Sequence, residues 1–202
     1  MCQDQKVAMS EDRAPSFYGV SVFAHEVGHT LGCADDGSPA TVPGLRGSEK
    51  CPGSDGYLMS HTRKGENKYR FSSCCQEDMR KFARKESSKC LTQTKFKKRI
   101  VKTGLPGAHT TQEEFCRRVY PYVLGVHYDK EYGVQDCRVR CQNATDRYTI
   151  SVVDGTPCDV LKNVREHCVL GKCVEFKRRL LRRLNTTLDM FLKSTVRRKP
   201  TQ

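Results

Sequence analysis

Twelve cysteines in 202 residues constrain the fold of this chain more than any other feature of its sequence. No two of them form a C-x-x-C pair, so their spacing does not match a zinc ribbon. Six lie in the first 90 residues and six between 116 and 173, which predicts two separately cross-linked modules. The alternative is a set of reduced, buried thiols. It suits the chain poorly, because only 37% of its residues are hydrophobic and none is tryptophan.

A second constraint lies in residues 25–36, which read His-Glu-Val-Gly-His-Thr-Leu-Gly-Cys-Ala-Asp-Asp. In an α-helix, His25 and His29 lie on one face, one turn apart, where two imidazoles can bind one metal ion. Glu26 lies beside them and is suited to take a proton from an attacking water. The alternative is two ordinary surface histidines, but the glutamate and Gly32 at the required spacing disfavour it. The pattern predicts zinc-dependent hydrolysis of peptide bonds.

Asp35 is the third predicted metal ligand, at the position where the longer form of this pattern has a histidine. Carboxylates bind zinc at about 2.0–2.2 Å, so one Zn²⁺ held by His25, His29 and Asp35 would keep an open position. Since Asp35 is short and adds negative charge, the alternative is a damaged, weakly metallated site. Gly32 is expected to end the helix and reverse the chain toward the metal. Met59 is interpreted as a floor under the ligands, although a lone methionine is more often a core filler.

Apolar periodicity predicts helices over residues 16–31 and about 73–85. The first carries an apolar stripe, with the histidines and glutamate lying off it: Phe17, Val20, Ala24, Val27 and Leu31. Thr111 and Glu114 form a capping-box pattern that predicts a short helix. Between 120 and 173 there is little periodicity and there are many turns, so a loop-rich module held by disulfides is expected.

The end of the chain is strongly basic, with nine basic and two acidic residues in 174–202, out of a net charge of +13 for the chain. Five apolar residues recur there at helical spacing: Phe176, Leu180, Leu184, Leu188 and Phe191. This pattern predicts a basic amphipathic helix that could bind heparan-type polyanions or anionic lipid. The alternative is a solvated helix that packs its leucines on the cysteine-rich module.

The cysteine content favours a secreted protein, and two glycosylation sequons, at Asn143 and Asn185, agree with that destination. Nucleic acid is not an expected partner of such a protein. No apolar run approaches the length of a transmembrane segment, and residues 1–5 contain no apolar core of a signal peptide. We therefore expect a signal peptide to lie upstream in a longer precursor, or to be missing from the gene model.

The sequence resembles the reprolysin (adamalysin-like) branch of the metzincins. Residues 25–36 and Met59 carry this resemblance. The chain is also similar to secreted salivary reprolysins of ticks, which have a C-terminal cysteine-rich region. This narrower resemblance rests on six further segments: 6–12, 51–52, 71–75, 132–137, 154–158 and 171–173. The resemblance covers about residues 2–173 and leaves out the basic tail. It implies one catalytic zinc ion and disulfides joining Cys2 to Cys90, and Cys33 and Cys51 to Cys74 and Cys75. The six later cysteines would pair among themselves.

The expected architecture is α+β. Residues 1–92 would be the C-terminal part of a reprolysin-type catalytic domain, with its active-site helix, Met-turn and last helix but without its upper sheet. Residues 93–110 would form a linker, 111–174 a disulfide-rich, loop-dominated module, and 175–202 the basic tail. The predicted function is a zinc metalloendopeptidase of extracellular proteins, by resemblance host matrix or clotting proteins. The alternative is a weak or inactive secreted protein that binds through the module and the tail, and Asp136-Cys137 is a weak hint of integrin binding.

Overall fold

The chain divides into two compact units. The computed structural model describes residues 2, 8–13, 16–92, 104–158 and 166–175. Among these, the second unit comprises 12–13, 16–19, 104–158 and 166–175, and the first comprises the others. The predicted basic helix lies outside the described residues except for Glu175, and so does much of the predicted linker.

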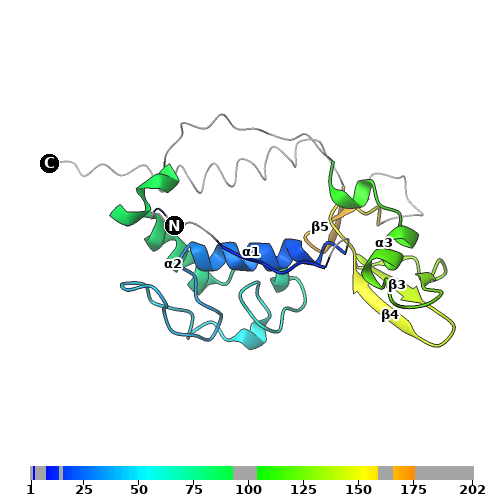
Figure 1. The fold of residues 1–202 in the computed structure, drawn as a ribbon, viewed down its shortest axis with the longest axis horizontal. Helices are drawn as coiled ribbons and strands as arrows, with labels where there is room; N and C mark the ends of the chain where they lie inside the picture. Colours follow the sequence, from blue (N-terminus) through cyan, green and yellow to red (C-terminus); the bar gives the residue numbers. More distant parts are fainter. Residues whose placement is uncertain (1, 3–7, 14–15, 93–103, 159–165, 176–202) are drawn as a thin grey trace. The chain divides into compact units, whose positions relative to one another are not determined.

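The first unit is helical, with a long irregular segment between its two α-helices (Figure 1). Helix α1 spans Tyr18–Thr30, of which all but the first two residues belong to this unit, and α2 spans Ser73–Ala83. Three short 3₁₀ helices complete it: η1 (Gly53–Asp55), η2 (Asn67–Tyr69) and η3 (Glu86–Thr92). Ser72 caps α2 by accepting a hydrogen bond from the Cys75 N–H at 3.3 Å.

Helix α2 holds the irregular segment through a buried carboxylate. Asp78 is 1% exposed and accepts hydrogen bonds from the backbone N–H groups of Arg46 at 2.9 Å and Gly47 at 2.7 Å. A buried carboxylate is costly unless such donors satisfy it, so these bonds fix where the segment runs. Met79 and Phe82 are buried on the same helix, as the periodicity predicts.

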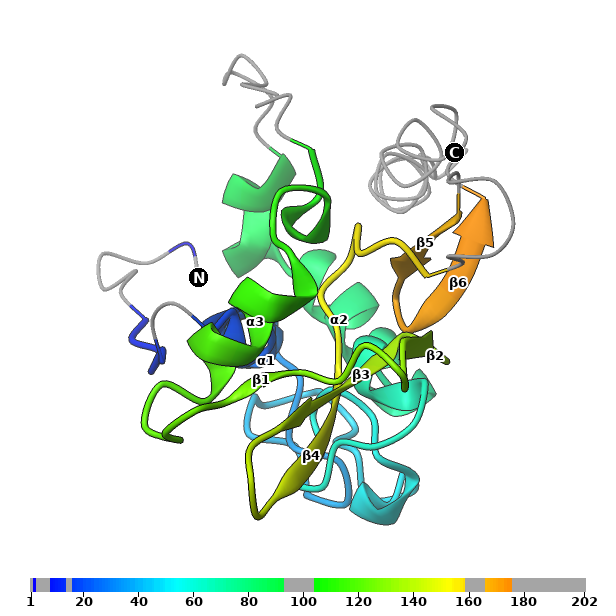
Figure 2. The same ribbon diagram turned by 90° about the vertical axis from the view of Figure 1, so that its right-hand side faces the viewer.

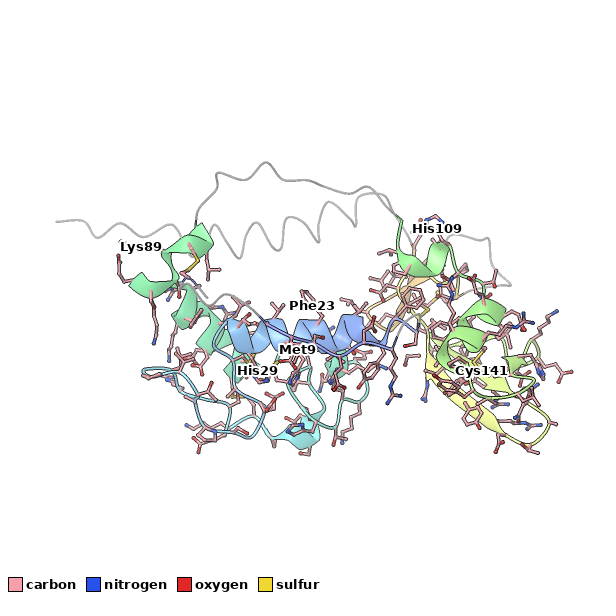
Figure 3. All side chains as sticks on the ribbon, viewed as in Figure 1. Met9, Phe23, His29, Lys89, His109 and Cys141 are labelled. Carbon is pink, nitrogen blue, oxygen red and sulfur yellow. A yellow bond between two sulfur atoms is a disulfide. The ribbon has the colours of Figure 1, made fainter. Side chains whose placement is uncertain are left out.

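Helix α1 buries a different face from the one its apolar stripe predicts. His25 and Gly28 are the buried residues of α1, whereas Val20 is 67% exposed and Phe23 is 62% exposed. Figure 3 labels Phe23 and His29 on opposite sides of this helix. The histidine face is buried because the segment around Leu58 and Met59 packs against it.

Three disulfides cross-link the first unit: Cys2–Cys90, Cys33–Cys75 and Cys51–Cys74. The last two end at neighbouring residues in the first turn of α2. They tie the end of α1 and the middle of the irregular segment to one helix. The chain from 33 to 75 is therefore closed into two nested covalent rings.

The second unit is a disulfide-held module with more regular structure than expected, because six short strands lie among its described residues (Figure 2). In its larger sheet, β3 (Arg138–Gln142) pairs along its length with β4 (Arg147–Ser151). Its two ends pair with β1 (His127–Tyr128) and β2 (Val134–Gln135). A separate antiparallel pair contains β5 (Glu166–Val169) and β6 (Lys172–Glu175).

One helix and three disulfides complete the core of the second unit. Helix α3 (Gln112–Val119) follows the short η4 (Pro106–Ala108), and Thr111 caps it by accepting from the Glu114 N–H at 3.1 Å. Phe115 and Cys116 of α3 are buried in one hydrophobic cluster with Val139 of β3, which is 0% exposed. The disulfides are Cys116–Cys141, Cys137–Cys168 and Cys158–Cys173.

The stability of the second unit is expected to depend on pH through the carboxyl group of Asp154. Burial raises the pKa of this carboxyl above its ordinary value of 3.8, while a hydrogen bond from the Leu170 N–H, at 2.8 Å, opposes the rise. A raised folded-state pKa means that stability is lost as pH increases from 3.8 through the folded-state pKa. We expect Asp154→Asn, which keeps the acceptor, to increase stability at pH 7.5, with the gain vanishing toward pH 3.8.

Urea denaturation followed by far-UV circular dichroism at several pH values measures this effect. Asp154→Ala is the matched control, because it removes the charge and the acceptor together. An equal gain for the alanine and asparagine variants at pH 7.5 would contradict the role given to the Leu170 hydrogen bond.

Candidate metal centre

The structure brings the two motif histidines together on the buried face of α1. His25 Nε2 and His29 Nε2 lie 3.1 Å apart, and the rings meet edge to face. His25 is 9% exposed, and His29 is partly buried. The separation follows from the helix, which places residues four apart on adjacent turns.

Backbone carbonyls determine which nitrogen of each ring is free. His25 Nδ1 lies 3.0 Å from the Leu58 carbonyl oxygen, and His29 Nδ1 lies 2.9 Å from the Cys33 carbonyl oxygen. A carbonyl can only accept, so each Nδ1 carries the proton and donates it. In the neutral rings both Nε2 atoms are therefore bare acceptors, which is the tautomer that metal-ligating histidines adopt.

Asp35 adds a third acceptor to this pair. Its Oδ1 lies 3.3 Å from His25 Nε2 and 3.5 Å from His29 Nε2. The same oxygen is buried and has no hydrogen-bond donor among the described residues. When both rings are neutral, three acceptor atoms converge here and repel one another, and a cation between them removes the repulsion.

The spacing of these atoms fits zinc. Nitrogen and oxygen ligands at about 2.0–2.2 Å in tetrahedral directions lie about 3.3–3.6 Å from each other. The three observed separations are 3.1, 3.3 and 3.5 Å. Two imidazoles and one carboxylate are also a donor set that catalytic zinc sites use. His25, His29 and Asp35 therefore could hold one zinc ion.

The turn after α1 brings Asp35 back to the helix. Gly32 has a φ of +90°, a left-handed conformation that favours glycine, and the Cys33 N–H donates to the Gly28 carbonyl at 3.1 Å. A Cβ at Gly32 would also lie 2.8 Å from side-chain carbons of Leu45 and Phe82. The Cys33–Cys75 disulfide then fixes the residue whose carbonyl orients His29.

Met59 packs closely against Gly28 of α1, the residue just before His29. It is 0% exposed, and a Cβ at Gly28 would lie 2.6 Å from the Met59 sulfur, so only glycine allows this approach. The Asp36 N–H donates to the Met59 carbonyl at 3.1 Å, which ties the methionine segment to the residue after Asp35. Leu58, the preceding residue, supplies the carbonyl for His25.

Asp36, the residue after Asp35, connects this segment to α2 by a hydrogen bond. Its Oδ1 accepts a 2.6 Å hydrogen bond from the Ser72 hydroxyl, at the cap of α2. Burial is the main cause that raises the pKa of Asp36. The charges of Asp35 and Asp55 add to the rise, while the Ser72 hydrogen bond and His25 oppose it. Asp36 thus links the ligand segment to α2.

Other residues with chemically reactive side chains lie near the three acceptors or form a cluster elsewhere. Glu26 is half-buried on α1, next to His25 in the chain. His61, which the sequence reasoning missed, lies with its Nε2 3.9 Å from Asp35 Oδ2. A histidine two residues after the predicted Met-turn methionine was the available signal. The sulfurs of Cys137, Cys158 and Cys168 also cluster, but all three are in disulfides and cannot act as thiolate ligands.

Residues 1–94 match the family model described as Reprolysin (M12B) family zinc metalloprotease. These residues belong to the reprolysin family. The reprolysin match contains all three residues of the candidate centre together with Glu26, Met59 and His61.

The curated proteins that the chain matches include several that are named as metalloproteinases. A protein of Bombyx mori named "A disintegrin and metalloproteinase with thrombospondin motifs like" is 30% identical over 180 residues, covering 83% of this chain and 24% of the relative. The human "A disintegrin and metalloproteinase with thrombospondin motifs 19" is 27% identical, over 86% of this chain and 14% of its own. A protein of Tityus trivittatus named "Venom metalloproteinase antarease-like TtrivMP_A" is 36% identical over 75 residues, which cover 36% of this chain and 19% of the relative. The chain thus spans a quarter or less of each.

Proposed function

We propose that this chain carries the metal-binding part of a zinc-dependent endopeptidase that hydrolyses peptide bonds in extracellular proteins. The observation that carries the proposal is the convergence of three acceptor atoms, 3.1–3.5 Å apart, with no donor for Asp35 Oδ1 among the described residues. Their identities are those of a catalytic zinc site, in which three protein ligands leave one position open.

Each residue has a distinct role in this proposal. Bound zinc would polarise the substrate carbonyl and make water a stronger acid. His25, His29 and Asp35 hold the ion, with the Leu58 and Cys33 carbonyls keeping both rings in the required tautomer. Glu26 takes a proton from the attacking water and delivers it to the leaving amine. Met59 forms the floor that supports the histidine face of α1.

The setting of the activity is proposed to be extracellular. Six disulfides use all twelve cysteines, a content typical of oxidising compartments. None of the helices in the described part of the chain has the length and apolar content to cross a bilayer. By family resemblance the substrates are matrix or clotting proteins of a host. Binding of heparan-type polyanions by 174–202 is proposed from its nine basic residues.

Glu26→Gln tests the proposed chemistry. Since glutamine cannot accept the proton, we expect cleavage of a labelled unfolded protein to fall by about 10²–10⁴-fold, the usual contribution of general acid–base catalysis. Zinc content, measured by native mass spectrometry, should not change, because Glu26 is not a ligand. Glu49→Gln, an exposed site in the same unit, is the matched control.

A Glu26→Gln protein that cleaves as fast as the parent would refute the assigned base. Loss of bound zinc in this variant would instead mean that Glu26 is a ligand.

The second candidate function is binding without catalysis, and one observation favours it. Tyr122 and Leu124 are 98% and 94% exposed on the loop between α3 and β1. Large apolar side chains displayed in this way are typical of surfaces that bind other proteins. A parent protein that binds zinc and captures extracellular proteins, but does not cleave them, would support this function over the first.

A further inference from the structure

The carboxylate of Asp35 has a second neighbour that the proposed zinc site does not use. While Oδ1 faces His25 and His29, Oδ2 lies 3.9 Å from His61 Nε2. The His61 side chain is 87% exposed and that of Asp35 is 28% exposed. The two oxygens of one short side chain thus face different histidines.

The backbone brings His61 to this place. The Asp36 N–H donates to the Met59 carbonyl, so the segment after Asp35 and the segment before His61 run side by side. Ser60, 2% exposed, bonds through its hydroxyl to the Gly53 carbonyl and accepts from the Thr62 N–H at 3.1 Å. His61 therefore projects from a segment that is held on both sides.

His61 lies outside the ligand set itself. Among the described residues, the atoms of His25, His29 and Asp35 all lie within 4.8 Å of one another, and His61 does not join that set. A fourth protein ligand would also close the open position that a catalytic zinc site keeps. His61 faces Oδ2, the oxygen of Asp35 that does not face the other two histidines, so it is placed to act on Asp35 rather than on the metal.

We propose that His61 is a positioning residue that holds Asp35 in the orientation in which Oδ1 faces the two ligand histidines; the inference rests on the proposed zinc site. The Nε2–H of His61 donates to Oδ2, which needs the exposed ring to approach by about 1 Å to reach hydrogen-bond distance. Carboxylates that ligate metals are usually held in this way by a second residue. Without it, Asp35 is free to turn either oxygen, or neither, toward the site.

The affinity of the complete, oxidised chain for Zn²⁺, measured by competition with a chromophoric chelator, tests the role. We expect His61→Ala to weaken zinc binding by about 10-fold, at the low end of the usual effect of losing such a partner. His61→Gln, which keeps an N–H donor, should recover most of the loss. His109→Ala, an exposed histidine of the second unit, is the matched control and should bind like the parent.

Two comparisons separate a positioning role from other roles. In an Asp35→His background, which has no carboxylate to hold, adding His61→Ala should change the affinity by less than twofold. The visible absorption bands of the Co²⁺-loaded protein should keep their positions in His61→Ala, because the ligand set is unchanged. A further loss in the Asp35→His background, or shifted Co²⁺ bands, would identify His61 as a ligand and overturn the proposal.

Failure of the site and failure of the inference give different results. A parent protein that binds no zinc at micromolar free metal would reject the proposed function and this inference together. A parent that binds zinc, with His61→Ala binding equally well, would reject the inference alone. Circular dichroism spectra that match the parent's establish that each variant is folded.

Discussion

Asp35→Ala is expected to lower the zinc affinity of this chain by at least about 100-fold, because losing a ligand should cost no less than losing a residue that only orients one. The variant removes the buried Oδ1 that lies 3.3 and 3.5 Å from the two histidine nitrogens. Zinc content after dialysis and chelator competition are the measurements. Asp35→His should keep the site, since it restores the third imidazole of the longer pattern.

Glu49→Ala is the matched control for this prediction, because Glu49 is an exposed carboxylate of the same unit. It should bind zinc like the parent. If Asp35→Ala also bound zinc like the parent, Asp35 would not be a ligand. The site would then depend on the two histidines alone, which is the weakly metallated alternative.

Cys33→Ser combined with Cys75→Ser is expected to destabilise the first unit by roughly 2–4 kcal/mol, the usual effect of removing a disulfide. The bond closes a separation of 42 residues between the end of α1 and the start of α2. It also fixes the Cys33 carbonyl that orients His29, so zinc affinity should fall as well, by about 10-fold. Chemical denaturation and chelator competition measure the two effects.

Removal of Cys158–Cys173 is the matched control for that variant. This bond lies in the second unit and closes a separation of 15 residues. It should leave zinc affinity unchanged while destabilising its own unit. Parent-like zinc affinity in the Cys33→Ser, Cys75→Ser protein would mean that hydrogen bonding alone holds the Cys33 carbonyl in place.

The candidate site was visible in the sequence because its two histidines are local. One turn of helix relates His25 to His29, so spacing alone indicates their convergence. Asp35 was inferred from the same pattern, with the left-handed Gly32 as the physical reason for its return. His61 could not be found in this way, since its approach to Asp35 depends on a backbone contact between residues 36 and 59.

Which face of α1 is buried was harder to predict than where the helix lies in the sequence. The stripe through Val20 and Ala24 suggested that the apolar side of α1 faces the core, yet Val20 is exposed and His25 is buried. Periodicity reports which residues share a face, and it does not report which face meets the rest of the unit. The carbonyl groups of Leu58 and Cys33 favour burial of the histidine face. They accept the hydrogen bonds that the Nδ1–H groups of His25 and His29 would otherwise lack.

The strands of the second unit could not be predicted from the sequence. They are too short to show a clear alternation of apolar and polar residues. β1 and β2 have two residues each, and β3 alternates over only five. In the tight turn between β2 and β3, Asp136 and Cys137 both have positive φ. Aspartate is favoured at the first of these positions, but the cysteine stands where glycine is usual. The Cys137–Cys168 disulfide is a covalent restraint at this turn that secondary-structure propensities do not include.

The nested rings closed by Cys33–Cys75 and Cys51–Cys74 make the ligand segment tolerant of a broken backbone. A single peptide-bond cut anywhere from residue 34 to 73 leaves two fragments that Cys33–Cys75 and Cys2–Cys90 still join. Exposed loops are where proteases cut first. A nicked chain would stay in one piece, heavier only by the water that hydrolysis adds, until a reductant separates the fragments. Until then the disulfides would keep the segment that carries Asp35 and His61 tethered to the end of α1.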